Sequence, residues 1–353
     1  MALRWQDWPP QVLAALRKGV VIPAHPLALT ADRRLDTRRQ RALARYYLDA
    51  GAGGLAVGVH TTQFAIRDVG LFKPVLELAV RSATEWAHEP PIMIAGLAGR
   101  TAQAVSEAQI ARDLGYHAGL LSLAALKGAD EDELIAHAQA IAREIPLVGF
   151  YLQPAVGGLV LPVSFWRRFA EIENVAAIKI APFNRYRTLD VLRGVAAAGA
   201  LDRVALYTGN DDHILLDLTL PFELRDRGVT TRAYFRGGLL GHWSVWTASA
   251  IKQFEMCKAA RGKAAVPADL LALDARVTDC NSAFFDVANN FHGCIAGCHE
   301  ILRRQGLLEG IWCLDPAEGL SPGQMQEIDR VCREHADLSD DDFVAANLQE
   351  WLA

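Results

Sequence analysis

The sequence predicts an α/β fold, a (β/α)8 TIM barrel with a helical C-terminal extension. In the first two thirds of the 353-residue chain, short apolar runs alternate with longer amphipathic segments. The apolar runs are continuous, as is typical of parallel strands buried on both faces. Hydrophobic residues make up 51% of the chain. That share supports a large buried core, and α/β barrels commonly form single domains of about 200 to 250 residues.

Seven apolar runs are predicted to be strands, with the helices between them. The strands are expected over residues 20–25, 53–59, 91–97, 117–123, 146–152, 174–181 and 203–209. The helices are expected over 36–50, 71–87, 101–114, 130–144, 163–172 and 186–199, and Thr101 is a candidate cap for the third of them. Seven βα units at this spacing are most simply explained by a (β/α)8 barrel.

The eighth unit is irregular. Residues 220–238 have the pattern of a hairpin around Arg225–Gly228, so strand eight is expected only loosely near 231–240, before a helix over 244–261. The rest of the chain has a helical pattern, and Ser321–Pro322 with Gln324, and Ser339 with Asp342, resemble helix starts. We expect two regions: residues 1–262, a barrel with an N-terminal helix and a hairpin insertion near 218–236, and residues 263–353, a helical extension packed on it.

Charge and hydropathy argue against two classes of partner. The net charge is −5 and the pI is about 6.1, with no block of like charge, so neither nucleic acid nor a membrane surface is expected to bind. The N-terminal stretch contains Asp7 and Pro9–Pro10 and lacks the apolar run of a signal peptide. No later stretch approaches the roughly 18 apolar residues of a spanning helix. A cytoplasmic protein is therefore expected.

All six cysteines lie in the last hundred residues and are expected to be free thiols. The segment HGCIAGCH deserves a test as a metal site, because it brings two histidines and two cysteines close together in sequence. It lacks the CxxC pair of structural zinc sites, and Cys294 and Cys298 also fit one packed face of a helix. We therefore predict no metal site here.

Lys179 is the most unusual strand residue. It lies in NVAAIKIAP (174–182), an apolar and β-prone run, although lysine is rarely fully buried. Alternation places Val175, Ala177 and Lys179 on one face, which is either the barrel mouth or the helix layer. Burial lowers the pKa of an amine, and a neutral amine can form a Schiff base with a carbonyl. The plain alternative is a lysine that extends out of a strand end to solvent. Seven lysines stand against twenty-nine arginines, which cannot form a Schiff base.

Tyr151 ends the preceding strand, in VGFYLQP. A phenol beside a Schiff base could carry protons to and from a substrate, whereas the plain interpretation is a tyrosine with an ordinary hydrogen bond. Because Tyr151 and Lys179 are expected at the same level of neighbouring strands, their side chains could meet.

Further candidates follow strands two, seven and eight. Thr61 and Thr62 could hold a carboxylate or could form a plain turn, and His60 could be a base, a ligand or a core histidine. Asp211 or Asp212, in YTGNDD, could simply cap a helix. The glycines of GGLLGHW could let the backbone approach a ligand. The substrate-binding candidates are Thr61, Thr62, Gly209, Asn210 and His242.

At these positions the sequence resembles the dihydrodipicolinate synthase and N-acetylneuraminate lyase family of class I aldolases, as a divergent member. The family consists of (β/α)8 barrels that bind a 2-oxo acid, typically pyruvate, on a strand-six lysine. AAIKIA resembles the family's lysine segment, which implies Lys179 as the Schiff-base residue. FYLQP resembles its Tyr-x-x-Pro segment, which implies Tyr151 as the proton-transfer tyrosine. The resemblance covers about residues 15–260 and also implies a homo-oligomer, a dimer or a tetramer.

The other family segments match less closely. GAGGLAVGVHTTQF is similar to the G-T-T-G-E loop, with His60 and Thr61 at the two threonines, although a one-residue slip would place Thr61–Thr62 there. TGNDD resembles the S-G-D-D segment. The tyrosine-containing segment after strand four is SLAA (122–125) here, and the arginine expected after Tyr151 is replaced by AVG (155–157). The resemblance therefore implies that the Schiff-base half of the family's chemistry is kept and that the acceptor half differs.

The leading hypothesis is a lyase or aldolase in which Lys179 attacks the ketone of a 2-oxo acid. Thr61 and Thr62 would hold the carboxylate, Tyr151 and His60 would move protons, and an unknown aldehyde would be the partner, with no metal or other cofactor. One alternative is a 2-oxo-3-deoxy sugar acid dehydratase that uses the same lysine. Others are a non-catalytic 2-oxo acid binder and a metal-dependent barrel enzyme using His60, Asp211 and His242.

Overall fold

Eight parallel strands form the central sheet of the chain, of which the computed structural model describes residues 2–226 and 228–353. The strands are β1 (Val21–Pro23), β2 (Gly54–Val57), β3 (Ile92–Leu97), β4 (Ala118–Leu121), β5 (Leu147–Leu152), β6 (Val175–Ala181), β7 (Ala205–Thr208) and β10 (Gly237–Leu240). They pair in the order β1-β10-β7-β6-β5-β4-β3-β2, and a parallel bridge between Ala24 and Ala56 joins the two ends. The predicted (β/α)8 barrel is therefore confirmed.

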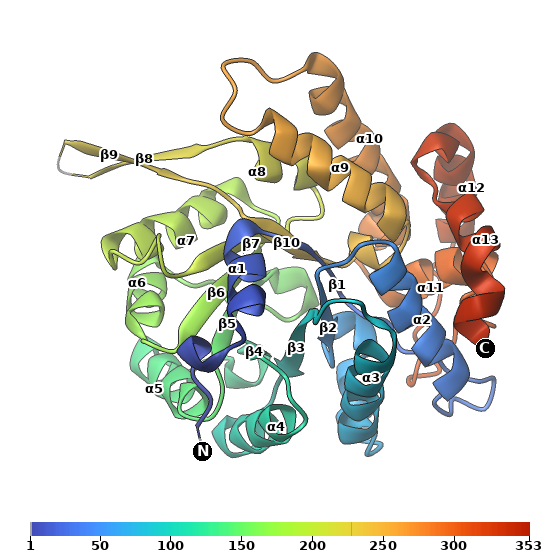
Figure 1. The fold of residues 1–353 in the computed structure, drawn as a ribbon, viewed down its shortest axis with the longest axis horizontal. Coiled ribbons are helices and arrows are strands. Elements are labelled where there is room, and N and C mark those ends of the chain that lie inside the picture. The colour runs from blue at the N-terminus through green and yellow to red at the C-terminus, as the bar shows by residue number, and fades with distance from the viewer. Residues whose placement is uncertain (1, 227) are drawn as a thin grey trace.

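The helices that alternate with these strands lie outside the barrel (Figure 1). They are α2 (Thr37–Asp49), α3 (Phe72–Trp86), α4 (Thr101–Asp113), α5 (Glu131–Ala142), α6 (Val163–Glu171), α7 (Arg185–Ala197), α8 (Ile214–Thr219) and α9 (Thr247–Ala260). One buried cluster fills the space between strands and helices, and a second, which includes Ile94, Leu120 and Leu239, fills the lumen. The strands are apolar on both faces because both faces are covered.

The N-terminal helix α1 (Pro10–Lys18) closes the amino end of the barrel. Val12 and Leu16 of this helix belong to the lumen cluster. The Tyr207 hydroxyl of β7 donates a hydrogen bond to the Leu16 carbonyl at 2.9 Å. Because this end is filled, the space for a ligand is expected at the carboxyl ends of the strands.

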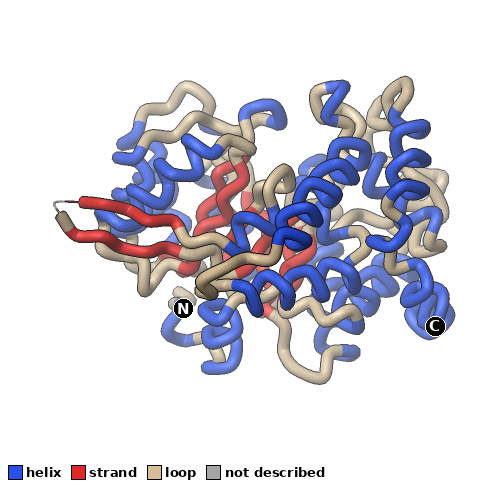
Figure 2. Tube along the Cα trace, turned by 90° about the horizontal axis from the view of Figure 1, so that it is seen from above, coloured by secondary structure: helices blue, strands red, loops and turns tan. Residues whose placement is uncertain are grey.

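The irregular eighth unit contains the expected hairpin. Strands β8 (Phe222–Asp226) and β9 (Val229–Ala233) pair antiparallel and project away from the barrel, as Figures 1 and 2 show. Strand eight of the barrel, β10, begins at Gly237, at the end of the range in which it was expected. The short helix α8 precedes the hairpin.

One expected helix cap is wrong. Thr101 is the first residue of α4, the capping position belongs to Arg100, and no side chain caps this helix end. The Thr101 hydroxyl instead lies 2.9 Å from the His137 Nδ1 atom on α5. A neighbouring helix therefore offers the hydroxyl a better partner than its own backbone.

The C-terminal extension consists of α10 (Ala268–Phe284), α11 (Cys294–Arg304), α12 (Gln324–Glu334) and α13 (Asp341–Leu352). The buried Asp340 carboxylate accepts hydrogen bonds from the Tyr46 hydroxyl of α2 at 2.7 Å and from the Ala248 N–H of α9 at 2.9 Å. Asp274 of α10 accepts the N–H groups of Leu215 and Leu216 at 2.9 and 3.1 Å. The extension thus supplies the cap of the barrel helix α8.

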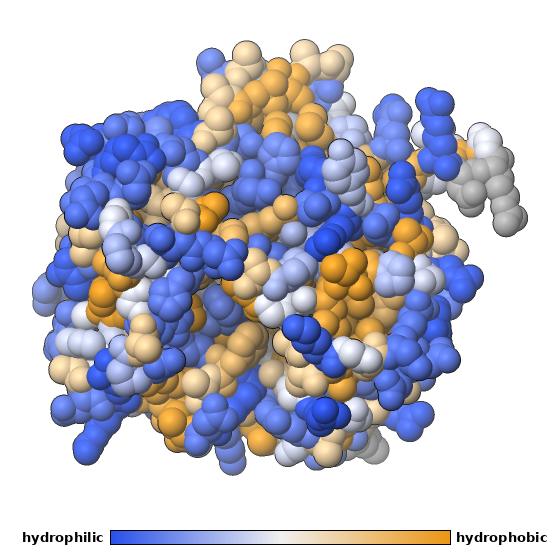
Figure 3. All heavy atoms as spheres, turned by 180° about the vertical axis from the view of Figure 1, so that it is seen from behind, coloured by the Kyte–Doolittle hydropathy of each residue, from blue (hydrophilic) through white to orange (hydrophobic). Residues whose placement is uncertain are grey.

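Hydrophilic side chains cover most of the face opposite to that of Figure 1, and hydrophobic ones are scattered among them (Figure 3). The large exposed apolar side chains lie on separate elements and include Val160, Tyr186 and Met256. None of the helices in the described part of the chain is long and apolar enough to cross a membrane.

Candidate active site

Lys179 points into the mouth of the barrel. Its backbone pairs with Phe150 on β5 and with Tyr207 on β7, and both partners belong to the lumen cluster. The side chain is only 8% exposed, and the Nζ atom lies 4.6 Å from the centre of the Phe150 ring. The alternative of a lysine that extends to solvent is therefore excluded, because its amine ends in a lined cavity.

A glycine makes room for the lysine stem. A Cβ atom on Gly209 would lie 2.6 Å from the Lys179 Cε atom, closer than real side chains approach one another. Gly209 follows β7, and its N–H donates to the Ile180 carbonyl at 2.8 Å. Gly209, predicted as a substrate-binding residue, therefore positions Lys179 between itself and the Phe150 ring.

Lys179 shares the cavity with the buried carboxyl group of Asp211. Burial lowers the pKa of Lys179, and the nearby Asp211 carboxylate partly opposes this effect. Burial raises the pKa of Asp211, against the N–H groups of His242 and Gly241 and the charge of Lys179. The two shifts move both groups toward neutral pH, where a lysine can attack a carbonyl and a carboxyl group can exchange protons.

His60 and Thr61 line the cavity from the short helical turn η2 (His60–Thr62) after β2. Burial, together with the charge of Lys179, lowers the pKa of His60 to about 4, so its imidazole is neutral at pH 7. The Thr61 hydroxyl donates to the Ala24 carbonyl at 2.8 Å. The helical hydrogen bonds of this turn come from the N–H groups of Thr62 and Gln63, so those of His60 and Thr61, its first two residues, are not used within the turn.

Three other predicted site residues support the cavity from behind. Thr62 accepts from the Gly58 N–H at 3.0 Å and donates to the His25 carbonyl at 2.6 Å. The Asn210 amide donates to Asp217 at 2.9 Å. The His242 N–H donates to Asp211 at 3.0 Å, and its ring stacks on Phe284 at 6.3 Å between centroids. The polar side-chain groups of Thr62 and Asn210 are thus engaged by neighbouring groups, whereas His242 contributes its backbone N–H and a stacked ring.

The expectation that Tyr151 meets Lys179 is wrong. Tyr151 pairs with Ile180, so its side chain points into the helix layer, where its ring packs on Trp166 at 5.1 Å between centroids. Its hydroxyl accepts from the Leu161 N–H at 3.2 Å. The lumen position beside Lys179 belongs to Phe150, which carries no hydroxyl.

A β-bulge explains this difference. Leu147 pairs with Val175, and continuing that register would place Tyr151 opposite Lys179. The next pair is Val148 with Ala177, so β6 contains one extra residue at this point, and every later pair is shifted by one. Because side chains alternate between faces, a shift of one residue sends Tyr151 to the opposite side of the sheet. The same bulge turns Val175 away from the lumen, into the outer cluster.

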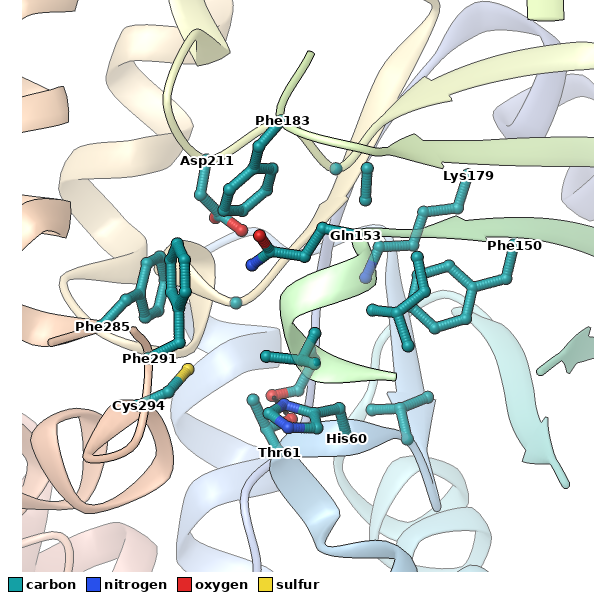
Figure 4. A pocket seen from close by; sticks show the side chains of 17 residues that line it. His60, Thr61, Phe150, Gln153, Lys179, Phe183, Asp211, Phe285, Phe291 and Cys294 are labelled. Atoms are coloured by element: carbon teal, nitrogen blue, oxygen red, sulfur yellow. Dashed lines mark hydrogen bonds between the residues drawn. The ribbon is translucent and has the colours of Figure 1, made fainter. Parts of the chain in front are cut away.

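The cavity also contains residues outside the predicted catalytic and substrate-binding set. Gln153 extends into it from the loop after β5, and Phe183 from the loop after β6 (Figure 4). Phe285, Phe291 and Cys294 reach it from the C-terminal extension and lie across the cavity from Lys179 (Figure 4). Strand-end position marks Gln153 and Asp211 as candidates, whereas no local pattern marks the three extension residues.

Taken as a whole, the cavity wall is largely apolar. Its remaining lining residues are Ala24, Val59, Leu152, Val156, Ala181 and Gly241. Including its open mouth, the cavity contains about 610 Å³ of space free of protein atoms. Among the lining residues, Lys179 is the only one of lysine or arginine type.

Within residues 2–226 and 228–353, no group of three or more His, Cys, Asp and Glu residues could hold a metal ion. Of the three residues of the metal-enzyme hypothesis, His60 and Asp211 line the cavity and His242 does not. In HGCIAGCH, Cys298 and His299 are buried within α11, and Cys294 faces the cavity. All six cysteines are free thiols.

The chain is similar in sequence to known proteins. Residues 18–223 match the Dihydrodipicolinate synthetase family. The 4-hydroxy-tetrahydrodipicolinate synthase of Bifidobacterium longum (strain DJO10A) is 28% identical over 209 residues, which are 58% of this chain and 62% of that protein. The corresponding synthase of Moorella thermoacetica is 28% identical over 210 residues, which are 58% and 65% of the two chains. Each match thus spans less than two thirds of the relative.

Solved structures share the fold over most of the chain. The chloride-inhibited dihydrodipicolinate synthase from Acinetobacter baumannii, complexed with pyruvate, has a TM-score of 0.72 and 18% identity, and the match covers 90% of this chain and 98% of that one. The N-acetylneuraminate lyase from Fusobacterium nucleatum has a TM-score of 0.71 and 18% identity, with 90% and 99% covered. At 18% identity this likeness establishes the barrel fold alone.

Proposed function

The chain belongs to the dihydrodipicolinate synthetase family, and we propose that it is a lyase or aldolase that binds a 2-oxo acid, such as pyruvate, as a Schiff base on Lys179. The observation that carries this proposal is a buried lysine at the carboxyl end of a barrel strand, with a lowered pKa and a cavity in front of it. The synthase from Acinetobacter baumannii was solved with pyruvate, which makes pyruvate the first ligand to test.

The covalent steps follow from the chemistry of a neutral amine. Nζ adds to the C2 carbon of the 2-oxo acid, and the carbonyl oxygen takes up two protons and leaves as water, so that Lys179 becomes an iminium. The iminium is the electron sink in place of a metal. When a base removes a proton from C3, the electron pair of the C3–H bond moves toward the iminium nitrogen and an enamine forms. The resulting enamine adds through C3 to the carbonyl carbon of an aldehyde, whose oxygen takes a proton. Water then hydrolyses the product iminium, and cleavage is the same sequence in reverse.

The carboxylate of the 2-oxo acid would bind at η2. The N–H groups of His60 and Thr61, which the turn does not use, are donors that a carboxylate needs, and the iminium adds a positive charge beside it. Thr62 holds the turn, and Asn210 and His242 hold the loops after β7 and β10. These residues contribute by keeping the donors and the lysine in place.

Proton transfer would fall to Asp211, with the neutral imidazole of His60 as a second polar group on the cavity wall. The raised pKa of Asp211 suits a group that removes the C3 proton in one step and returns a proton in another. Tyr151 is too deeply engaged with Leu161 in the helix layer to serve in this structure.

A second candidate function is a 2-oxo acid binder without turnover, and the position of Tyr151 favours it. The family-type tyrosine lies outside the cavity, and the described cavity wall contains no phenol. If Asp211 does not replace the tyrosine, iminium formation would proceed and C–C chemistry would not. A 2-oxo-3-deoxy sugar acid dehydratase is less well supported, because a sugar chain requires more polar partners than this wall offers.

Borohydride trapping tests the proposal. The wild-type chain and its Lys179→Arg variant would be incubated with pyruvate, or with other 2-oxo acids, and reduced with sodium borohydride. Intact mass and peptide mapping should show a stable adduct on the peptide that contains Lys179, and none in the variant. Lys252→Arg, which changes a lysine outside the cavity, is the matched control and should retain the adduct. If no 2-oxo acid gives an adduct on Lys179, the proposed function is wrong.

The expected homo-oligomer is proposed from family membership. Light scattering of the purified chain against its 38.5 kDa protomer mass should give a dimer or tetramer. A mass equal to one protomer at micromolar concentration would contradict it.

A further inference from the structure

We propose that the aldehyde partner of this enzyme is apolar and aromatic, and that it binds against Phe183, Phe285 and Phe291, here called the phenylalanine wall. The inference rests on the proposed Schiff-base function, because it names the second substrate of that same site. It would distinguish the protein from a barrel that takes a carboxylate-bearing aldehyde or a sugar.

The phenylalanine wall is built from two distant parts of the chain. Phe183 follows β6, whereas Phe285 and Phe291 flank the turn between α10 and α11. The rings of Phe183 and Phe291 approach edge to face, with 5.8 Å between centroids and 62° between planes. Figure 4 shows Phe285 and Phe291 across the cavity from Lys179, so a molecule attacked by an enamine on the lysine would extend toward these rings.

Two of the rings are presented by unusual backbone. Phe183 has a φ of 48° and Phe291 a φ of 67°, values that bulky side chains rarely adopt. Such conformations persist only when the surroundings hold them, and they concentrate at binding and catalytic sites. Here the Phe183 N–H donates to Asn210 at 3.2 Å, and the Phe291 N–H donates to the Asp286 carbonyl at 2.9 Å. The fold therefore holds aromatic rings at backbone positions that glycine or asparagine would occupy with less strain.

The charges in the cavity argue against a second anionic group. Lys179 is the only lysine or arginine among the lining residues, and the iminium places its charge beside the first carboxylate. A carboxylate or phosphate on the aldehyde would face Asp211 without a cation of its own. The aldehyde oxygen needs one proton donor, which Asp211 can provide, and the rest of the molecule meets phenylalanine rings.

The cavity wall also offers few hydrogen-bond partners for the hydroxyl groups of a sugar. Beyond the groups assigned to the 2-oxo acid and to proton transfer, the polar lining residues are Gln153 and Cys294. Burying hydroxyl groups without partners is costly, whereas an aromatic ring gains both apolar burial and edge-to-face contacts. The lining therefore favours an aryl aldehyde over a sugar.

The first experiment measures aldol formation from pyruvate with three aldehydes, namely benzaldehyde, glyceraldehyde and succinic semialdehyde. Chromatography with mass detection would quantify each 4-hydroxy-2-oxo acid product. We expect kcat/KM to be at least about tenfold higher for benzaldehyde than for either polar aldehyde. Trapping of the pyruvate adduct is measured in the same samples. If the adduct forms and either polar aldehyde matches or exceeds benzaldehyde, the aromatic inference fails and the Schiff-base function stands.

The second experiment separates the phenylalanine wall from lysine chemistry. Benzyl alcohol cannot form a Schiff base, and calorimetry should show it binding to the wild-type chain. The variant Phe291→Asn replaces the ring with a residue that tolerates this backbone conformation. It should weaken the binding of benzyl alcohol at least about tenfold and leave pyruvate trapping unchanged. Tyr186→Ala removes an exposed aromatic ring outside the cavity and is the matched control. Equal affinity of the wild type and Phe291→Asn for benzyl alcohol would overturn the inference. Absence of pyruvate trapping in the wild type would instead overturn the proposed function.

Discussion

The two sides of the cavity differ in origin and in chemical character. Lys179, Gly209 and Asp211 lie at the carboxyl ends of β6 and β7 and bring an amine and a carboxyl group together. Phe285, Phe291 and Cys294 come from the C-terminal extension, more than forty residues after β10, and are mostly apolar. The barrel side thus carries the ionisable pair Lys179 and Asp211, and the extension side carries two phenylalanine rings and a thiol. Residues 18–223, which match the family, include the first side and exclude the second.

The largest expected effect is on the barrel side. Asp211→Asn should lower kcat by about 10² to 10⁴, because it removes the proposed proton-transfer group, while the pyruvate adduct on Lys179 still forms. Turnover with an accepted aldehyde and borohydride trapping would be measured together. Asp212→Asn, an exposed neighbour, is the control and should keep its activity. Unchanged turnover in Asp211→Asn would assign proton transfer to another group.

The next effect is steric. Gly209→Ala places a Cβ atom against the Lys179 stem, so the amine is displaced and the trapping rate should fall by about 10²-fold. Gly319→Ala, with no atom within 4 Å of the added Cβ, is the matched control. We expect Gly209→Ala to trap pyruvate more slowly than the wild type. Gly319→Ala should match the wild type in both trapping rate and thermal midpoint. Full trapping by Gly209→Ala would show that the lysine does not depend on this glycine.

The pH dependence of trapping tests how burial and Asp211 set the pKa of Lys179. Only the neutral amine attacks, so at fixed pyruvate the trapping rate should rise about tenfold per pH unit and level off above the pKa of Lys179. Burial lowers this pKa from 10.5, so the midpoint should lie well below that of a free lysine. The Asp211 carboxylate raises it, so Asp211→Asn should move the midpoint to lower pH. A midpoint near 10.5 would contradict the burial of the amine.

The smallest expected effect is on stability, at the contact between the C-terminal extension and the barrel. Asp274→Ala removes the acceptor of the Leu215 and Leu216 N–H groups, through which the extension caps α8. Loss of such a cap should lower the free energy of unfolding by about 1 to 2 kcal/mol in chemical denaturation. Asp269→Ala, at an exposed position at the start of the same helix, is the control. Equal stability of both variants would show that this contact does not fasten the extension to the barrel.

The residue pattern was sufficient to predict the barrel and to single out the lysine at its mouth. Continuous apolar runs are required wherever helices cover one face of a strand and the lumen the other, so the strands could be found from the order of apolar residues along the chain. A lysine within such a run is expensive to bury, so its place in the sequence is enough to mark Lys179 as unusual. The short extent of β10 and the role of Thr101 were not foreseen, because both depend on neighbours distant in the sequence.

The sequence pattern did not predict which side chains surround Lys179. Tyr151 and Phe150 are adjacent, and one extra residue in β6 decides which of them faces the lysine, although no residue type marks the bulge. Phe285, Phe291 and Cys294 enter the cavity because α10 and α11 pack over the barrel mouth, and such packing leaves no periodic trace near the strands. Local chemistry fixes what a residue can do, whereas register and long-range packing decide which residues act together.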